Sequence, residues 1–237
     1  MNSAAEWKLD ENRARLTVGP LSAVMDLAAP QRGLHQMTLA AQPLLGCELL
    51  GVELDPMGRT LIDSYQRGGD LVATFAEAPS AAASTQVYWR AALLQVNDAI
   101  CPAIDLEISV QTSRLESRPA VRTRSHLPAG DMAGFATLPP AQSVARELFE
   151  HGIVFYPSGW STSYVEMVHP SGAEASQISK PNETTIEIAH RLFECELEKG
   201  VILRARTRGM FVPRSDDLLF ATAAWRQFLQ EPPPLTT

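Results

Sequence analysis

Residues 104–111 read I-D-L-E-I-S-V-Q, so apolar and polar side chains alternate strictly along this stretch. Successive side chains of a β-strand point to opposite faces of the sheet, and the alternation therefore predicts a strand with one dry and one wet face. Similar patterns recur along most of the chain between short, turn-rich segments. We therefore predict an all-β fold, a large and mostly antiparallel β-sandwich with one or two short helices, and treat residues 1–237 as a single β-sandwich domain.

The predicted strands, most of them alternating, are separated by turn-forming residues. They cover residues 15–18, 21–27, 35–40, 49–54, 71–76, 86–96, 104–112 and 121–126. The run at 71–76 is apolar on both faces, which predicts a strand buried between two layers. Residues 55–58, D-P-M-G, predict a turn.

Two segments have helical rather than strand spacing. Residues 141–150 place apolar side chains on one stripe, and Gly152 follows as the expected C-terminal cap. Residues 216–229 repeat the helical pattern, with Ser215 as the expected N-cap and two aspartates in the first turn.

The segment around Lys199-Gly200 predicts a hairpin, because alternating runs flank it on both sides. The side-chain period of two favours a three-residue loop, residues 198–200, over a two-residue loop that would set acids against apolar partners. Gly200 then takes the left-handed position of a G1 bulge. The resulting pairs are Leu197 with Val201, Cys195 with Leu203 and Glu194 with Arg204.

The composition of the chain limits the kinds of partner and cofactor that we expect. The net charge is −7, which argues against a nucleic-acid partner because phosphate binding requires a basic surface. The three cysteines are widely spaced and form no C-x-x-C pair, so we expect reduced, mostly buried thiols, with no metal and no cofactor. No secretory h-region and no apolar run of about 18 residues is visible, so we expect no membrane partner and a cytoplasmic protein. The oligomeric state stays open.

Two basic strand faces are candidate binding surfaces. Arg204 and Arg206, with Arg208, share one face near the end of the chain, and Arg122 and Arg124 share another with His126. Arginine's planar fork suits carboxylate, phosphate or hydroxyl groups, so each face could bind a ligand. The alternative is a solvated face with cross-strand ion pairs, which we favour for both.

His126 and His169 are the candidates for proton transfer, because an unperturbed imidazole titrates near neutral pH. Glu166 lies three residues before His169, so a regular strand would point the two side chains to opposite faces. Trp160 and Tyr164 could stack against a sugar, or could cap an edge of the core. No P-loop, G-x-S-x-G, H-E-x-x-H or G-x-G-x-x-G motif occurs in the chain.

Several stretches together resemble the galactose mutarotase-like β-supersandwich superfamily, which includes aldose and hexose-phosphate epimerases. They are Y-Q-R-G-G-D-L-V-A-T-F at 65–75, Q-V-Y-W-R at 86–90, I-D-L-E-I-S-V-Q-T-S-R-L-E-S at 104–117 and L-E-K-G-V-I-L-R-A-R at 197–206. The resemblance lies in the style and order of the strands over about two-thirds of the chain. It implies a two-layered sandwich with a cleft that binds a carbohydrate or a sugar phosphate.

The resemblance also implies roles for residues. A histidine, His126 or His169, would protonate the ring oxygen of the sugar, and a glutamate, Glu166 or Glu187, would deprotonate the anomeric hydroxyl. The implied substrate-binding residues are Arg122, Arg124, Trp160, Tyr164, Arg204 and Arg206. The chain lacks the asparagine–histidine and Tyr-Phe-Asn segments found around the epimerase site. A non-catalytic sugar-binding sandwich and a purely structural protein therefore stay open as alternatives.

Overall fold

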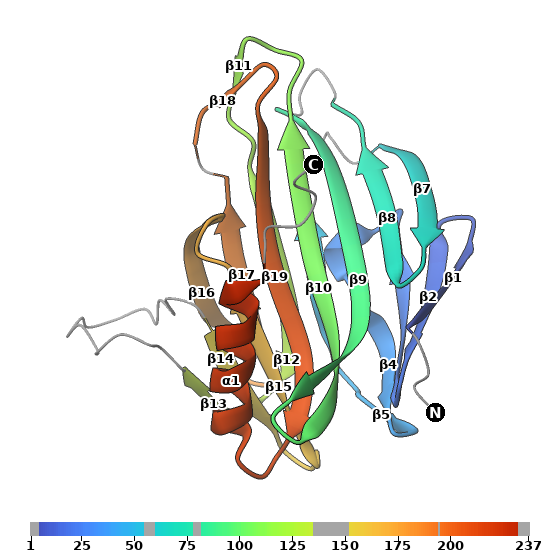
Figure 1. Ribbon diagram of the computed structural model, residues 1–237, viewed down its shortest axis with the longest axis vertical. Helices are drawn as coiled ribbons and strands as arrows, with labels where there is room; N and C mark the ends of the chain where they lie inside the picture. Colours follow the sequence, from blue (N-terminus) through green and yellow to red (C-terminus); the bar gives the residue numbers. More distant parts are fainter. Residues whose placement is uncertain (1–4, 55–59, 78–81, 135–151, 194, 232–237) are drawn as a thin grey trace, which may run out of the picture.

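The computed structural model describes residues 5–54, 60–77, 82–134, 152–193 and 195–231. Its strands form sheets of eight, five, four and two strands. Figure 1 shows the eight-stranded sheet as the front layer, with the five-stranded and four-stranded sheets behind it. Every strand pairing in the described ranges is antiparallel, so the predicted all-β antiparallel sandwich is confirmed.

The strands are assigned to the sheets as follows. In spatial order, the eight-stranded sheet contains β13 (Gly130–Gly134), β14 (Gly152–Pro157), β15 (Thr162–Val168), β19 (Ile202–Pro213), β10 (Ala99–Gln111), β9 (Ser84–Val96), β8 (Asp70–Phe75) and β7 (Leu61–Arg67). The five-stranded sheet contains β1 (Glu6–Asp10), β2 (Arg13–Val18), β3 (Leu21–Asp26), β4 (His35–Leu39) and β5 (Gln42–Pro43). The four-stranded sheet contains β16 (Ala173–Asn182), β17 (Thr185–Leu192), β12 (Val121–Pro128) and β6 (Glu48–Glu53), and the two-stranded sheet pairs β11 (Glu116–Ser117) with β18 (Leu197–Glu198).

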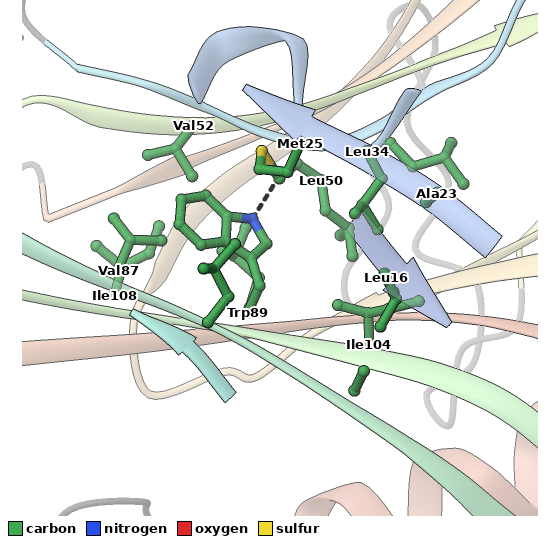
Figure 2. Close-up of a cluster of buried hydrophobic side chains, with 14 of the residues drawn as sticks. Leu16, Ala23, Met25, Leu34, Leu50, Val52, Val87, Trp89, Ile104 and Ile108 are labelled. Atoms are coloured by element: carbon green, nitrogen blue, oxygen red, sulfur yellow. Dashed lines mark hydrogen bonds between the residues drawn. The ribbon is translucent and has the colours of Figure 1, made fainter. Parts of the chain in front are cut away.

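The main core lies between the layers, where the apolar halves of the alternating strands meet. Trp89 on β9 is fully buried there, among side chains from both layers such as Val52 and Ile108 (Figure 2). Removing a tryptophan side chain from such a position typically costs about 3–5 kcal/mol. The run at 71–76, predicted to be buried between two layers, forms β8 up to Phe75. Leu71, Val72, Ala73 and Phe75 have almost no exposed surface, whereas Thr74 is partly exposed.

A second core lies on the other face of the eight-stranded sheet, under helix α1 (Asp217–Gln230) (Figure 1). The helix predicted at 216–229 is therefore confirmed. Its predicted N-cap is wrong, because the cap is Asp216 in a left-handed conformation, without a side-chain hydrogen bond. The Asp217 carboxylate instead accepts a 2.5 Å hydrogen bond from the Ser163 hydroxyl of β15. The predicted helix at 141–150 and the predicted turn at 55–58 lie outside the described residues.

The segment around Lys199-Gly200 agrees only in part with its prediction. Gly200 has the expected positive φ, +85°, and a turn hydrogen bond joins the Val201 amide to the Glu198 carbonyl. The predicted cross-strand pairs do not form among the described residues, because β18 pairs with β11 while β19 inserts between β10 and β15. Glu194 lies outside the described residues. Insertion of a twelve-residue strand in the centre of a sheet satisfies far more backbone groups than a short hairpin would.

The first half of the face of residues 104–111 that was predicted to be wet is buried, whereas Ser109 is partly exposed and Gln111 is exposed. Asp105 and Glu107 are 9% and 3% exposed, because arginines of the neighbouring strand cover them. Arg208 binds both oxygens of Asp105, at 2.5 and 2.7 Å, and also binds Glu231 at the end of α1 at 2.8 Å. Arg206 donates to the Phe228 carbonyl at 2.7 Å and lies 4.1 Å from the centre of the Phe228 ring. Neither Arg206 nor Arg208 therefore lies on a solvated face, and both fasten the helix to the sheet.

We predict that Arg208→Gln lowers the free energy of unfolding by about 3–5 kcal/mol, because it leaves the Asp105 carboxylate buried without its partner. Arg118→Gln is the matched control. Arg118 forms an exposed ion pair with Glu196 at 2.8 Å, and losing it should cost about 1 kcal/mol or less. Urea denaturation measures both effects. Equal losses in the two variants would contradict the role given to the buried pair.

Candidate functional site

Strand β6 carries one more residue than the strand it faces. Gly51 lies opposite Arg124 of β12, and Glu48 lies opposite His126, so three steps on β6 match two steps on β12. Leu50 has a positive φ of +56° within this bulge. The extra residue shifts the alternation by one, and Glu48 and Glu53 therefore both face outward although they are five positions apart.

Two buried hydrogen bonds hold the bulge. The Leu50 amide donates to the Ser125 hydroxyl at 2.9 Å. The indole nitrogen of Trp89, from the opposite layer, donates to the Leu50 carbonyl at 3.4 Å (Figure 2). A left-handed conformation at a residue other than glycine costs on the order of 1–3 kcal/mol and persists only where its surroundings fix it. The bulge therefore depends on both layers of the sandwich.

The Ser125 hydroxyl in turn donates to Glu166, which is fully buried on β15. The same carboxylate accepts from the Tyr164 hydroxyl at 2.6 Å and contacts His190 Nε2 at 3.0 Å. Burial and the Glu166 charge raise the pKa of Tyr164 well above its usual value, so its hydroxyl stays a donor. Glu166 and Tyr164 therefore lie together between the layers, and the histidine beside Glu166 is His190, from β17.

The outer face of the four-stranded sheet carries a continuous chain of charged groups. His126 Nε2 lies 3.0 Å from Glu187 on β17, and His126 Nδ1 lies 3.8 Å from Glu48 on β6. Arg124 joins Glu187, at 3.4 Å, to Glu53, at 2.8 Å. At the other end, the Arg32 guanidinium binds Glu48 at 3.0 Å. His126 thus lies between two carboxylates from neighbouring strands.

This charged chain ends in a groove of about 740 Å³, a size typical of small-molecule sites. The segment from η1 (Pro30–Arg32) to the start of β6 forms one wall, and β12 with the β16–β17 turn forms the other. The polar lining comprises Arg32, His35, Gln36, Thr38, Glu48, His126, Asn182 and Thr185, and the apolar lining includes Met37, Pro43, Leu44 and Leu45.

Gly51 allows η1 to approach this closely. A Cβ at position 51 would lie 2.2 Å from the Gln31 carbonyl oxygen, so only glycine lets the η1 backbone pass over β6. This close approach brings Arg32, the next residue, to Glu48 at the edge of the groove.

The structure brings some of the predicted residues together and separates others. His126, Glu187, Arg124 and Arg122 share one face, where Arg122 lies 3.8 Å from Glu53. His169 contacts the Ser171 hydroxyl at 2.8 Å and the edge of the Phe228 ring, away from that face. Trp160, which lies in the β14–β15 turn, packs against Phe211 of β19. Arg204 and Arg206 lie on the eight-stranded sheet, so the two predicted basic faces belong to different layers.

Sequence reasoning missed Arg32, Glu48 and Asn182 as lining residues of the groove. Glu48 precedes the strand predicted at 49–54, and strict alternation from Glu53 would turn it inward. Two glycines, Gly33 and Gly51, were the available signal, since both are places where backbones approach within 3 Å of an added Cβ. Neither glycine by itself indicates which segments it brings together.

The described residues give little support to a metal site or to a cysteine nucleophile. They contain no group of three or more His, Cys, Asp or Glu side chains placed to hold a metal ion. Cys47 and Cys101 are buried and reduced, and burial raises their thiol pKa to about 12 and about 11, so neither is a ready nucleophile. Cys195 is exposed, unlike the other two. No helix in the described ranges is long and apolar enough to cross a membrane.

Comparison with known proteins identifies the fold but no family. No family model and no curated protein matches the chain. A solved structure from Escherichia coli K12, provisionally assigned as an aldose 1-epimerase, aligns over 82% of this chain and 97% of its own, with 7% identity and a TM-score of 0.56. A TPR-domain containing protein from Parabacteroides distasonis ATCC 8503 aligns over 95% of this chain and 49% of its own, with 9% identity and a TM-score of 0.57.

The chain therefore has the galactose mutarotase-like supersandwich fold, as the sequence resemblance implied. Identities this low establish the fold alone, because one fold can carry several functions.

We predict that Gly51→Ala lowers the free energy of unfolding by about 1–3 kcal/mol, because the added Cβ forces η1 away from β6. The displaced Arg32 should also weaken ligand binding in the groove. Gly68→Ala is the control, since its Cβ would meet no atom within 4 Å and only its positive φ of +58° adds strain. Denaturation and binding measurements on both variants check this. Undiminished ligand binding in Gly51→Ala would contradict it.

Proposed function

We propose that the chain binds a carbohydrate in the 740 Å³ groove and acts there as an aldose 1-epimerase. The observation that carries the proposal is the position of His126, between the carboxylates of Glu187 and Glu48 at the groove edge. The fold supports it, because a protein provisionally assigned as an aldose 1-epimerase has the same one. The groove combines an apolar wall with a few polar groups, which is typical of small-molecule sites.

The carboxylates of Glu187 and Glu48 differ in their access to the groove. Glu187 does not line the groove, and its bond to His126 Nε2 can fix the orientation of the imidazole. Glu48 lines the groove beside His126 Nδ1. We therefore assign His126 as the acid, Glu187 as its positioning residue and Glu48 as the base.

The reaction needs two proton transfers that balance. His126 donates a proton to the ring oxygen of the sugar, while Glu48 removes the proton of the anomeric hydroxyl. The C1–ring oxygen bond breaks, and the open aldehyde forms. Rotation about C1–C2 and reversal of both transfers close the ring with the other anomeric configuration, and each group regains its starting state.

The charges of this face favour a neutral sugar over a sugar phosphate. Arg32, Arg122 and Arg124 each have a glutamate partner, so their positive charges are neutralised within the face. Binding a phosphate would require one of these ion pairs to open. Arg32 and Asn182 can instead donate hydrogen bonds to sugar hydroxyls along the groove.

A non-catalytic sugar-binding protein is the second candidate, and one observation favours it. His126 is bonded directly to Glu187 at 3.0 Å, and Glu48 is already paired with Arg32. An acid and a base that flank a sugar would leave a gap of sugar size between them. Binding without turnover would therefore be the expected outcome of this alternative.

The test follows the change in optical rotation of fresh α-D-glucose and α-D-galactose with wild type and two variants. His126→Ala and Glu48→Gln should each lower the enzymatic rate about 100-fold or more, since each removes a proton-transfer group. His169→Ala is the control, because its imidazole contacts Ser171 and Phe228 rather than the groove.

Thermal melting of every variant separates a lost fold from a lost reaction. Wild type that binds these sugars by calorimetry but leaves their rotation unchanged supports the non-catalytic alternative. Wild type that neither binds nor converts them contradicts the proposed function.

A further inference from the structure

The outer face of the eight-stranded sheet holds a second set of polar residues in three cross-strand rows. Each row crosses β8, β9, β10 and β19 at one register position. The first row is Asp70, Arg90, Asp105 and Arg208, the second is Val72, Tyr88, Glu107 and Arg206, and the third is Thr74, Gln86, Ser109 and Arg204.

The arginines of the first two rows have carboxylate partners. Arg90 binds Asp70 at 3.0 Å and Glu107 at 3.3 Å. Arg208 binds Asp105, and Arg206 binds Glu231 at 3.2 Å. These rows are internally neutralised, and α1 ends against them.

The third row differs, because its arginine has no such partner. Among the described residues, Arg204 makes no hydrogen bond or ion pair, and its Nε is buried without an acceptor. An unpartnered buried donor is costly, so its presence calls for a group that completes it. Arg204 also lines a pocket of about 300 Å³, with Thr74, Ser84, Gln86, Tyr88 and Ser109.

The pocket walls are held in place by their own hydrogen bonds. The Tyr88 hydroxyl donates to the Gln86 amide oxygen at 2.5 Å, and the Gln86 amide nitrogen donates to the Thr74 hydroxyl at 3.2 Å. Arg204 lies beside them with its Nε unpartnered in the described chain, and Ser109 also lines the pocket. The buried donor left open at this pocket is therefore that of the Arg204 guanidinium, which also carries a full positive charge.

We propose that this pocket is a second ligand site, which binds a small oxyanion, the carboxylate or phosphate group of a small molecule, with Arg204 as its charged ligand. The forked guanidinium matches either group, and Ser109 can add a hydroxyl donor. The volume suits a small metabolite rather than a polymer. The site lies on a different layer from the groove and shares no residue with it.

The acid in the neighbouring row is compatible with this ligand. Glu107 lies in the second row beside Tyr88, and its Oε2 has no hydrogen-bond partner in the described chain. Burial raises its pKa to about 7, against the opposing charges of Arg90 and Arg206. Its carboxyl can therefore take up a proton near neutral pH, which limits repulsion of a bound anion.

The experiment is calorimetric titration of the full chain with inorganic phosphate and, separately, with acetate. At least one of them should bind, and Arg204→Gln should weaken that binding at least about tenfold, or about 1.4 kcal/mol. Arg118→Gln, which removes an exposed arginine elsewhere, should leave it unchanged. Phosphate binding without acetate binding identifies a phosphate site, and the reverse identifies a carboxylate site.

The melting temperature of Arg204→Gln and the anion binding of a second variant, Ser109→Ala, distinguish a lost site from a lost fold. Arg204→Gln should retain the wild-type melting temperature, because the side chain loses no partner, and Ser109→Ala should weaken the same anion more mildly. The proposal is overturned if neither anion binds wild type with a Kd below about 10 mM, or if Arg204→Gln binds as tightly as wild type.

Discussion

The extra residue of β6 at Leu50 is the constraint on which the candidate site depends. Its backbone is held from two sides, by the Ser125 hydroxyl within the four-stranded sheet and by the Trp89 indole of the opposite layer. Without it, the alternation of β6 would turn Glu48 into the core and leave His126 without its second carboxylate. A local departure from regular strand geometry thus decides which charges meet on the surface.

The two faces of β12 have separate tasks that the bulge connects. Its inner side contributes Ser125 to the buried Glu166 network, which joins strands of both layers. Its outer side presents Arg124 and His126 to the groove face. Because neighbouring residues of one strand serve the two networks, the buried contacts fix the register of the groove residues. We infer that stability and ligand binding are coupled through this strand.

The sequence alone predicted many of the strands, the C-terminal helix and the fold class, because period-two and helical spacing are local properties. It did not predict β1, β7, β14 or β16. It also predicted His126 and Glu187 as candidates, but not that they are neighbours. Arg206 and Arg208 were expected on a solvated face, and only the packing of α1 explains their burial. Glu48 was missed because an extra residue reverses its side, and the Leu50 conformation has no sequence signature comparable to glycine.

Disulfide trapping tests most directly whether the bulge places residue 48 of β6 opposite residue 126 of β12. In a Cys47→Ser background, one variant carries cysteines in place of Glu48 and His126, and the other in place of Leu49 and His126. Directly opposed residues of antiparallel strands lie within disulfide range, whereas residues on opposite faces do not. We predict rapid oxidation of the 48–126 pair and none of the 49–126 pair, read by peptide mapping. The reverse result would contradict the account.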